Sequence, residues 1–383
     1  MVKTGVLLVN TGTPSEPTVG GVRDFLAEML SDPMLVSVPR PLWNIVLNRF
    51  ILPRRPQRTV TSYQEVWTAQ GAPFLLTSLR QRDLLSAELE RRVAARSETR
   101  SDREAARPGA WKVELAMRYG EPSIAAGLEA LRAARCGRVV VVPMYPQYAK
   151  VCAGTCLKEA RAQLDALAGR TGWRPQVLEV ESFHEQPAYL DALADGVRAC
   201  WEWHAGAKLL VSFHSTPLAD IRAGDPYERQ TKETAAALAR RLGVPDEDCI
   251  VAYQSRFDNR KWLSPFTDAT AEILGATGVA DLCVVAPGFV ADNIETSIEL
   301  GRGLRELFVK EARRFGTTAP RFTLVPALGE APGLIAALAD AVEAVLPEDL
   351  QAPAALPDGA PAAAQAEACH AAGAGPGTLA TGR

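Results

Sequence analysis

Histidine is scarce in this chain, and one of the histidines stands where a sheet would present it to a ligand. The 383 residues contain four, at positions 184, 204, 214 and 370. His214 follows an apolar run in the segment LLVSFHSTP. Parallel sheets bind ligands at the carboxyl ends of their strands, so His214 is a candidate proton acceptor or metal ligand. The alternative is an ordinary core or loop imidazole. So few histidines exclude a multi-histidine metal cage.

A group of carboxylates follows another apolar run, residues 282–285. The segment PGFVADNIETSIEL contains Asp292, Glu295 and Glu299. Asp292 and Glu295 have the spacing of a helix N-cap and its capping-box partner. Glu295 and Glu299 are four residues apart, and like charges on one helical face are mildly destabilising. This acidic face is therefore either merely solvated or a site that handles protons or cations.

Common catalytic motifs are missing from the sequence. No G-x-G-x-x-G follows the first apolar run, and there is no G-x-x-x-x-G-K-[ST]. The nucleophile elbow G-x-S-x-G and the zinc helix H-E-x-x-H are absent as well. Dinucleotide enzymes, P-loop NTPases and the usual α/β hydrolases are therefore disfavoured.

Composition narrows the class of protein further. Hydrophobic residues make up 47%, which is typical of a globular chain, and 42 basic against 45 acidic residues leave a net charge of −3. Nucleic-acid binding normally requires a basic excess, so we expect no nucleic-acid partner. No apolar run reaches the ~18 residues of a membrane span, and the N-terminus lacks the features of a signal peptide. We therefore expect a cytoplasmic protein.

Strands and helices are predicted to alternate along the chain. Buried strands are expected at 5–9, 139–142, 209–211, 250–252 and 282–285, and amphipathic helices at 123–134, 187–202, 233–242 and 268–275. This alternation predicts an α/β fold with parallel sheets. Residues 95–109 are charged and are expected to form a solvated loop. The Ala-, Pro- and Gly-rich residues 351–383 cannot bury enough apolar area to fold, so a disordered tail is expected.

Eight segments in order give the chain a resemblance to the ferrochelatases, enzymes that insert ferrous iron into a porphyrin to make haem. They are LLVNTGTP (7–14), FLAEMLSDP (25–33), SYQEVWTAQGAPFL (62–75), AMRYGEPS (116–123), VPMYPQY (142–148), SFHSTP with GDPY (212–217 and 224–227), YQSRF with WL (253–257 and 262–263) and PGFVADNIET (287–296). Each segment alone is weak evidence, whereas eight in order over most of the chain are specific.

The resemblance implies an architecture. We expect an α/β protein with two Rossmann-like, chelatase-type domains, each a parallel β-sheet flanked by helices, and the active-site cleft between them. The expected boundaries are 1–170 for the first domain and 171–325 for the second. A C-terminal helix within 326–350 would pack back on the first domain, ahead of the tail at 351–383. Residues 41–58 would form a lip over the porphyrin.

The resemblance also implies an activity. It is the insertion of ferrous iron into protoporphyrin IX to form protohaem, the terminal step of haem biosynthesis, by a lyase with Fe²⁺ as substrate and no required cofactor. His214 and Glu295 would be the catalytic and metal-binding pair, facing each other across the macrocycle. Asp292 and Glu299 would continue an acidic track. A coproporphyrin ferrochelatase and a non-catalytic porphyrin- or haem-binding protein on the same fold are the alternatives.

Porphyrin binding is expected to involve basic and hydroxyl side chains. The candidates are Thr11, Arg54, Arg55, Arg58, Tyr63, Arg118, Tyr119 and Tyr145. Guanidinium groups pair bidentately with carboxylates such as the porphyrin propionates, although a solvated basic turn is the alternative for the arginine cluster. The preceding apolar stretch, 41–53, resembles the lip and could also touch the inner face of the membrane, giving peripheral association. An ordinary packed helix is the alternative.

The sequence departs from the family pattern at two places. Ser215 stands where the family often has Gly after the histidine. The segment AKVCAGTCLKEA replaces a Ser-, Thr- and Gly-rich continuation and contains Cys152 and Cys156. A [2Fe–2S] cluster usually needs four thiolates, so one hypothesis joins these two to two further cysteines. Unlinked thiols are the alternative. The tail has only Cys369, which excludes the version held by three C-terminal cysteines.

Overall fold

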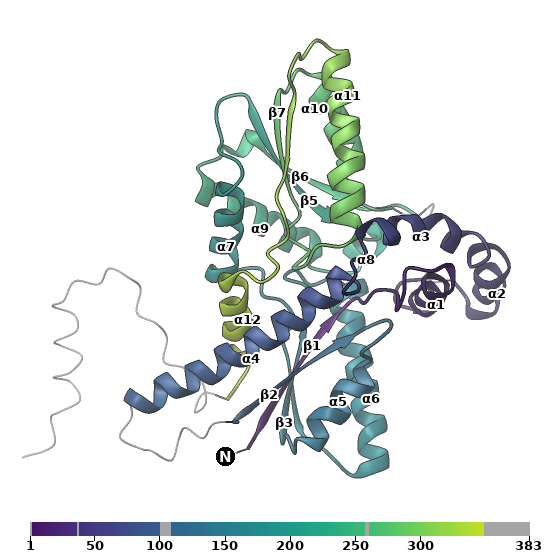
Figure 1. Ribbon diagram of the computed structural model, residues 1–383, viewed down its shortest axis with the longest axis vertical. Coiled ribbons are helices and arrows are strands. Elements are labelled where there is room, and N and C mark those ends of the chain that lie inside the picture. Colours follow the sequence, from purple (N-terminus) through teal and green to yellow (C-terminus); the bar gives the residue numbers. More distant parts are fainter. Residues whose placement is uncertain (1, 37, 100–108, 257–259, 348–383) are drawn as a thin grey trace, which may run out of the picture. The chain divides into compact units, whose positions relative to one another are not determined.

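Two parallel sheets of the same topology form the framework of residues 1–345, which make up one compact unit. The structure is a computed structural model and describes residues 2–36, 38–99, 109–256 and 260–347. The first sheet has the order β2-β1-β3-β4 and the second the order β6-β5-β7-β8. Every strand pair is parallel. The fold is therefore α/β with two four-stranded parallel sheets flanked by helices, as the sequence predicts (Figure 1).

The elements alternate along the chain. The strands are β1 (Thr4–Asn10), β2 (Trp111–Met117), β3 (Arg138–Pro143), β4 (Gln176–Glu179), β5 (Ala207–His214), β6 (Cys249–Gln254), β7 (Asp281–Val285) and β8 (Arg321–Leu324). The α-helices are α1 (Val19–Leu30), α2 (Arg40–Val46), α3 (Arg55–Val66), α4 (Pro73–Thr99), α5 (Ile124–Ala133), α6 (Thr155–Thr171), α7 (Pro187–Arg198), α8 (Leu218–Arg222), α9 (Tyr227–Leu242), α10 (Thr267–Ala276), α11 (Arg305–Arg314) and α12 (Pro332–Ala344). The π-helices are η1 (Leu47–Ile51), η2 (Lys150–Gly154) and η4 (Glu295–Leu304), and η3 (Asp246–Asp248) is a 3₁₀ turn.

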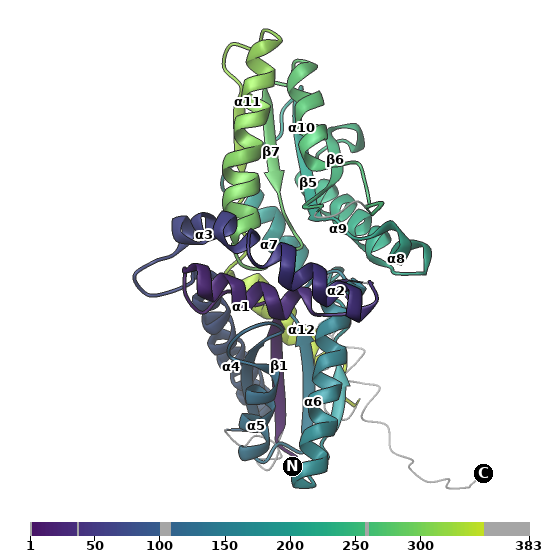
Figure 2. The same cartoon turned by 90° about the vertical axis from the view of Figure 1, so that its right-hand side faces the viewer.

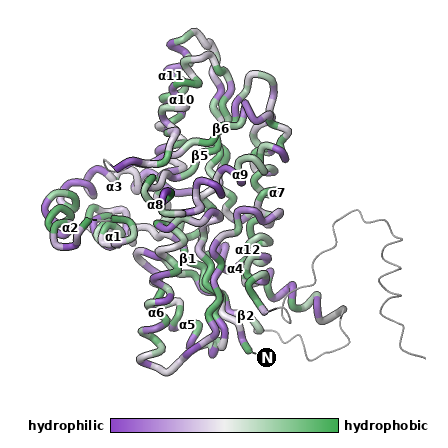
Figure 3. The backbone as a smooth tube through the Cα atoms, turned by 180° about the vertical axis from the view of Figure 1, so that it is seen from behind, coloured by the Kyte–Doolittle hydropathy of each residue, from purple (hydrophilic) through white to green (hydrophobic). Residues whose placement is uncertain are grey.

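The central strands explain why the two sheets form. All seven residues of β1 and all six of β3 are buried, and β5 is buried except at two positions. Strands covered on both faces by helices read as continuous apolar runs, which is the pattern of these segments. Figure 3 shows the same feature as hydrophobic stretches along β1 and β5. Because β1 and β5 pair on both sides, their carboxyl ends are fixed points in the fold.

Three strands were missing from the predicted set, and all three lie at sheet edges. Strand β2 interrupts its apolar pattern with Lys112 and Glu114, which are half-buried. Strands β4 and β8 have four residues each and no fully buried position. Since β4 pairs with β3, the first sheet continues past the boundary predicted at residue 170, and the change of sheet comes after Glu179. Interrupted or short apolar patterns explain why these three strands were not recognised, whereas β6, the fourth edge strand, has an unbroken apolar run and was predicted.

Helix α4 corrects another expectation. It runs to Thr99, so residues 95–99 are helical rather than part of a loop, while 100–108 lie outside the described residues. Helix α12 packs against both α4 and α7. Two arginines of α4 bind its acidic side chains: Arg92 donates to Asp340 at 2.6 Å, and Arg96 to Glu343 at 2.7 Å. These contacts hold α12 against α4, the helix that precedes β2 of the first sheet. The tail predicted at 351–383 lies outside the described residues.

Helices α1, α2 and α3 stand together beside the level at which the two sheets meet (Figures 1 and 2). They enclose an apolar cluster of their own that includes Phe25, Leu30 and Tyr63. In the described part of the chain, no helix is long and apolar enough to cross a membrane.

Candidate active site

A cavity of about 680 Å³ lies where the carboxyl ends of the central strands meet. The loops after β1, β3 and β5 and the segment from Gly288 to Glu299 form its wall, together with residues of α1 and α3. Binding sites for small molecules and cofactors typically enclose ≈ 300–1,000 Å³. The cavity therefore has the size of a ligand site and the position expected in a parallel α/β fold.

His214 is the last residue of β5 and lines this cavity. Its Nδ1 lies 2.7 Å from the carbonyl oxygen of Ser215. A carbonyl only accepts hydrogen bonds, so Nδ1 carries the proton in the neutral ring and Nε2 keeps its lone pair. The backbone oxygen of His214 also accepts a bond from the Tyr227 hydroxyl at 2.9 Å. Burial lowers the pKa of His214. The side chain is thus held as a neutral imidazole, able to accept a proton or bind a metal.

Glu295 begins the π-helix η4 and lines the same cavity. Burial and, after it, the negative charge of Glu299 raise the pKa of Glu295 from 4.5 to about 7. Near neutral pH the carboxyl group is therefore about half ionised, which suits a group that takes up and releases protons. The sequence predicts an ordinary helix here, whereas the structure has π turns, which are frequent at functional sites.

Glu299 lies further along η4, is exposed, and also lines the cavity. The Ser255 hydroxyl donates to its Oε2 at 2.6 Å. Ser255 has φ +63°, a left-handed conformation that a non-glycine residue adopts at a cost. Ser255 was not among the predicted site residues. Only its place directly after β6, at a strand carboxyl end, could have pointed to it.

Asp292 lines the cavity, but local contacts hold its carboxylate. Its Oδ1 accepts bonds from the Thr296 hydroxyl at 2.9 Å and the Ala327 amide at 3.3 Å. The predicted capping box of Asp292 and Glu295 is wrong, because Asn293 and Thr296 exchange the two reciprocal bonds instead. This shift by one residue leaves the Glu295 side chain free for the cavity. Asp292 thereby fixes the start of η4.

The arginines of the predicted basic cluster lie in two different environments. Arg55 and Arg58, on α3, line the cavity. Arg54 precedes the helix, is not part of the cavity wall, and donates to the Phe50 carbonyl at 3.3 Å. Tyr63 lines the cavity from one turn further along α3 and is only 8% exposed. Burial, followed by the charge of Glu295, raises the pKa of Tyr63. Its hydroxyl is therefore a neutral group electrostatically coupled to Glu295.

Arg118 and Tyr119 also line the cavity, where Asp32 binds both. The Arg118 guanidinium donates to Asp32 Oδ2 at 2.6 Å and the Tyr119 hydroxyl donates to the same oxygen at 2.8 Å. Asp32 is 5% exposed, and its charge neutralises Arg118. Arg118 thus supports the wall rather than offering an uncompensated cation. The sequence placed Asp32 in a family segment without assigning it a role.

Thr11 and Tyr145 meet in the cavity wall, where their hydroxyls share a hydrogen bond. They come from the loops after β1 and β3, which are neighbours in the sheet. Gly12 has φ +109°, and a Cβ there would lie 1.8 Å from the Tyr119 carbonyl oxygen. Only glycine allows the loop after β1 to approach the loop after β2, which carries Tyr119, so closely.

Cys152 and Cys156 occupy different positions. Cys152 lines the cavity, and Cys156 is fully buried behind it. Burial raises the pKa of Cys152 to about 12 and also raises that of Cys156, so both are neutral thiols. Within the ranges that the structure describes, no third His, Cys, Asp or Glu ligand joins them in a metal-binding group. These residues do not fit a four-thiolate cluster, and Cys369 lies outside the described residues.

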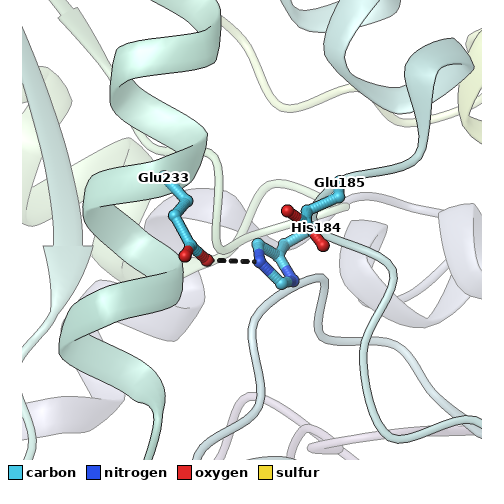
Figure 4. Close-up of side chains that lie close together, drawn as sticks. All are labelled: His184, Glu185 and Glu233. Atoms are coloured by element: carbon cyan, nitrogen blue, oxygen red, sulfur yellow. Dashed lines mark hydrogen bonds and ion pairs between the residues drawn. The ribbon is translucent and has the colours of Figure 1, made fainter.

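One group of metal-ligand side chains does come together among the described residues, and it lies outside the cavity wall. It consists of His184, Glu185 and Glu233, whose ligand atoms lie within 4.8 Å of one another (Figure 4). The carboxylate of Glu233 accepts bonds from His184 at 3.0 Å and from Arg229 at 2.8 Å. The arginine already neutralises the Glu233 carboxylate, while Nδ1 of His184 is buried without a hydrogen-bond partner among the described residues.

Comparisons with known proteins agree with the motifs in the sequence. A family model described as Ferrochelatase matches residues 3–346. A ferrochelatase from Thioalkalivibrio sulfidiphilus is 41% identical over 339 residues, covering 88% of this chain and 85% of that protein. One from Bordetella pertussis is 39% identical over 342 residues, covering 89% and 88%. Among solved structures, SirB from Bacillus subtilis with Fe³⁺ shows 13% identity and a TM-score of 0.47, over 90% of this chain and 95% of that one. From the family match and its relatives, the chain belongs to the ferrochelatase family.

Proposed function

We propose that this lyase, whose family inserts metal into porphyrin in haem synthesis, uses Fe²⁺ and protoporphyrin IX as substrates. We further propose His214 and Glu295 as the residues that take up the two pyrrole protons. The observation that carries the proposal is the pairing, in one cavity, of a neutral imidazole with a carboxyl group whose pKa is about 7.

The chemistry requires two proton acceptors. When Fe²⁺ enters the macrocycle, two N–H bonds break and two protons leave, so charge is conserved. His214 accepts one proton at Nε2, and the ionised Glu295 accepts the other. Glu299, exposed at the cavity rim and bound to Ser255, receives the proton from Glu295 and releases it to water. Asp292 keeps the start of η4 in place and is not a proton carrier in this scheme.

The choice of porphyrin follows from the cations and the apolar wall. Protoporphyrin carries two carboxylates, and Arg55 and Arg58 on α3 supply two guanidinium groups. Three further arginines line the wall: Arg118, Arg256 and Arg260. Arg118 is paired with Asp32 and Arg256 with Asp268 at 2.9 Å, and Arg260 donates to the Leu35 carbonyl at 3.3 Å. The α1 side of the cavity contributes Phe25, Leu26 and other apolar residues, which suit vinyl and methyl groups. Coproporphyrin, with four carboxylates, fits this wall less well.

Anaerobic assays of Fe²⁺ insertion test the proposal. The wild type should turn over protoporphyrin faster than coproporphyrin when both are offered. His214→Ala should abolish insertion while porphyrin binding, followed by fluorescence quenching, stays largely intact. Glu295→Gln should lose activity at every pH, because the amide cannot accept a proton. Arg54→Ala, which changes an arginine outside the cavity wall, is the matched control for Arg55→Ala. Full activity of the His214 variant would rule out the assignment.

We also propose that the lip, defined as α2 and η1, contacts the membrane surface. Three apolar side chains stand out from it: Leu42, Ile45 and Phe50 are 57%, 61% and 55% exposed. Arg40 and Arg49 flank them and would face anionic headgroups. An apolar patch with basic neighbours is typical of interfacial binding.

A vesicle sedimentation assay tests whether the lip binds the membrane surface. Vesicles containing anionic lipid should retain the wild type, and replacing Leu42, Ile45 and Phe50 together by Ser should release most of it. Ile273→Ser is a matched control, since Ile273 on α10 is 61% exposed and distant in sequence from the lip. Equal retention of the triple variant and the wild type would contradict the membrane role.

A further inference from the structure

We infer that Gln81, a residue outside the cavity wall, is a positioning residue for the reaction: its amide holds the segment that carries Glu295. The inference rests on the proposed role of Glu295. Gln81 lies on α4 and has no solvent exposure.

The amide of Gln81 donates two hydrogen bonds to distant parts of the chain. Its Nε2 lies 2.9 Å from the Val290 carbonyl oxygen and 2.7 Å from the Gly329 carbonyl oxygen. The Val290 carbonyl also accepts the Gly329 amide at 3.0 Å, so both of its lone pairs are used. One side chain thus joins α4 to two loops that come more than 200 residues later.

These loops lead directly to the reacting carboxyl. Val290 lies five residues before Glu295, in the wall of the cavity. Two residues further on, Asp292 is bound by the Ala327 amide of the second loop and by the Thr296 hydroxyl of η4. The path from Gln81 to Glu295 therefore runs through hydrogen bonds at Val290, Asp292 and Thr296, which anchor this segment up to the start of η4. Arg80, the neighbour of Gln81, adds an ion pair with Glu330 at 3.0 Å.

Burying the Gln81 amide carries a free-energy cost, which indicates that its two N–H donors have a structural role. Its Oε1 is buried without a hydrogen-bond partner among the described residues. An unsatisfied buried acceptor is unfavourable, and an apolar side chain of similar size would avoid it. The helix nearby is apolar, with Leu85 and Leu89 fully buried. Ser78, one turn earlier, is also polar and buried, but its hydroxyl is bonded to the Phe74 carbonyl and the Asn10 amide. What the Gln81 amide supplies is the pair of bonds to the loops.

Two near-isosteric replacements distinguish the effect of losing these hydrogen bonds from the effect of changing the packing. Gln81→Met keeps the volume and removes both donors, and Gln81→Glu keeps the shape but places a carboxylate against two carbonyl oxygens. Position 81 does not line the cavity, so in both variants the KM for protoporphyrin should change less than about threefold. We expect kcat for Fe²⁺ insertion to fall by about 10- to 100-fold, because small displacements of a reacting group cost that much. The midpoint of the acidic limb of the pH–rate profile, which we expect near pH 7 in the wild type, should also move.

Leu85→Ala is the matched control, because it weakens the packing of the same helix face without removing a bond to the loops. It should lower the melting temperature while leaving kcat and the pH midpoint unchanged at temperatures where the protein is folded. The inference is overturned if folded Gln81→Met retains wild-type kcat, or if its loss of activity matches that of Leu85→Ala with an unmoved midpoint. An inactive wild type would instead refute the proposed function.

Discussion

The pH midpoint of Glu299→Gln tests the electrostatic part of the proposed proton path, whereas the loss of Glu299 as a proton acceptor would lower the rate at every pH. The substitution removes one negative charge at the cavity rim, and the amide oxygen can still accept the bond from Ser255. Glu299 is the second cause, after burial, of the raised pKa of Glu295, and it also raises the pKa of His214. Removing its charge should therefore lower both pKa values.

The size of the effect follows from two bounds. The pKa of Glu295 rises from 4.5 to about 7, and at 1.36 kcal/mol per unit this corresponds to about 3 kcal/mol in favour of the protonated form. Burial causes the larger share. Coulomb's law for two charges about 6 Å apart gives roughly 0.7 kcal/mol in water and 2.8 kcal/mol at a dielectric constant of 20. Because Glu299 is exposed, about 1 kcal/mol is reasonable, which is roughly a fivefold change in the ionisation constant of Glu295.

The assay is the pH dependence of kcat for anaerobic Fe²⁺ insertion. The proton acceptor must be ionised, so activity should rise with pH through the pKa of Glu295. In the wild type the midpoint should lie near pH 7, and in Glu299→Gln it should fall by about 0.7 of a pH unit. At pH 6 the variant should therefore be relatively more active than at pH 8, when each rate is divided by that of the wild type.

Glu306→Gln is the control for a change of net charge. Glu306 begins α11, is exposed, and is not part of the cavity wall. Its replacement should leave the midpoint where it is. A midpoint that stays at its wild-type value in Glu299→Gln, or that rises, would refute the assigned coupling between the two carboxyl groups.

Two further predictions concern the cavity wall. Asp32→Asn should lower the free energy of unfolding by about 3–5 kcal/mol in urea titrations, since it leaves the Arg118 guanidinium buried without its counter-charge. Burial raises the pKa of Asp32, but hydrogen bonds from Thr155, Met34 and Tyr119 and the charge of Arg118 outweigh burial and lower the pKa below 3.8. The difference in unfolding free energy between variant and wild type should therefore narrow as the pH falls below 3.8. A difference that stays constant with pH would contradict the ion pair. Gly12→Ala should cost at least about 2 kcal/mol, measured in the same way, because alanine must adopt φ +109° with its Cβ against a carbonyl oxygen. An unchanged stability would show that the loops can separate.

The central strands of both sheets could be predicted from the sequence, while three of the four edge strands could not. Strands β1, β3, β5 and β7 are recognisable because burial on both faces requires unbroken apolar runs, and the edge strand β6 has such a run as well. The edge strands β4 and β8 bury less and were missed. The π-helix η4 was also not predictable, since the i, i+4 spacing of its two glutamates is equally compatible with an α-helix.

The sequence by itself determined the family, the chemical types available and the position of His214 at the end of a buried strand. Those properties depend on local pattern and residue order. Only the tertiary structure decided which charges remain available: Asp32 neutralises Arg118, Arg54 lies outside the cavity wall, and Thr296 holds Asp292. It also decided the protonation of Glu295, because burial and the neighbouring carboxylate raise its pKa only once the chain has folded around it. Hydrogen-bond partners hundreds of residues apart, such as Gln81 and Gly329, follow from packing and leave no local signal in the sequence.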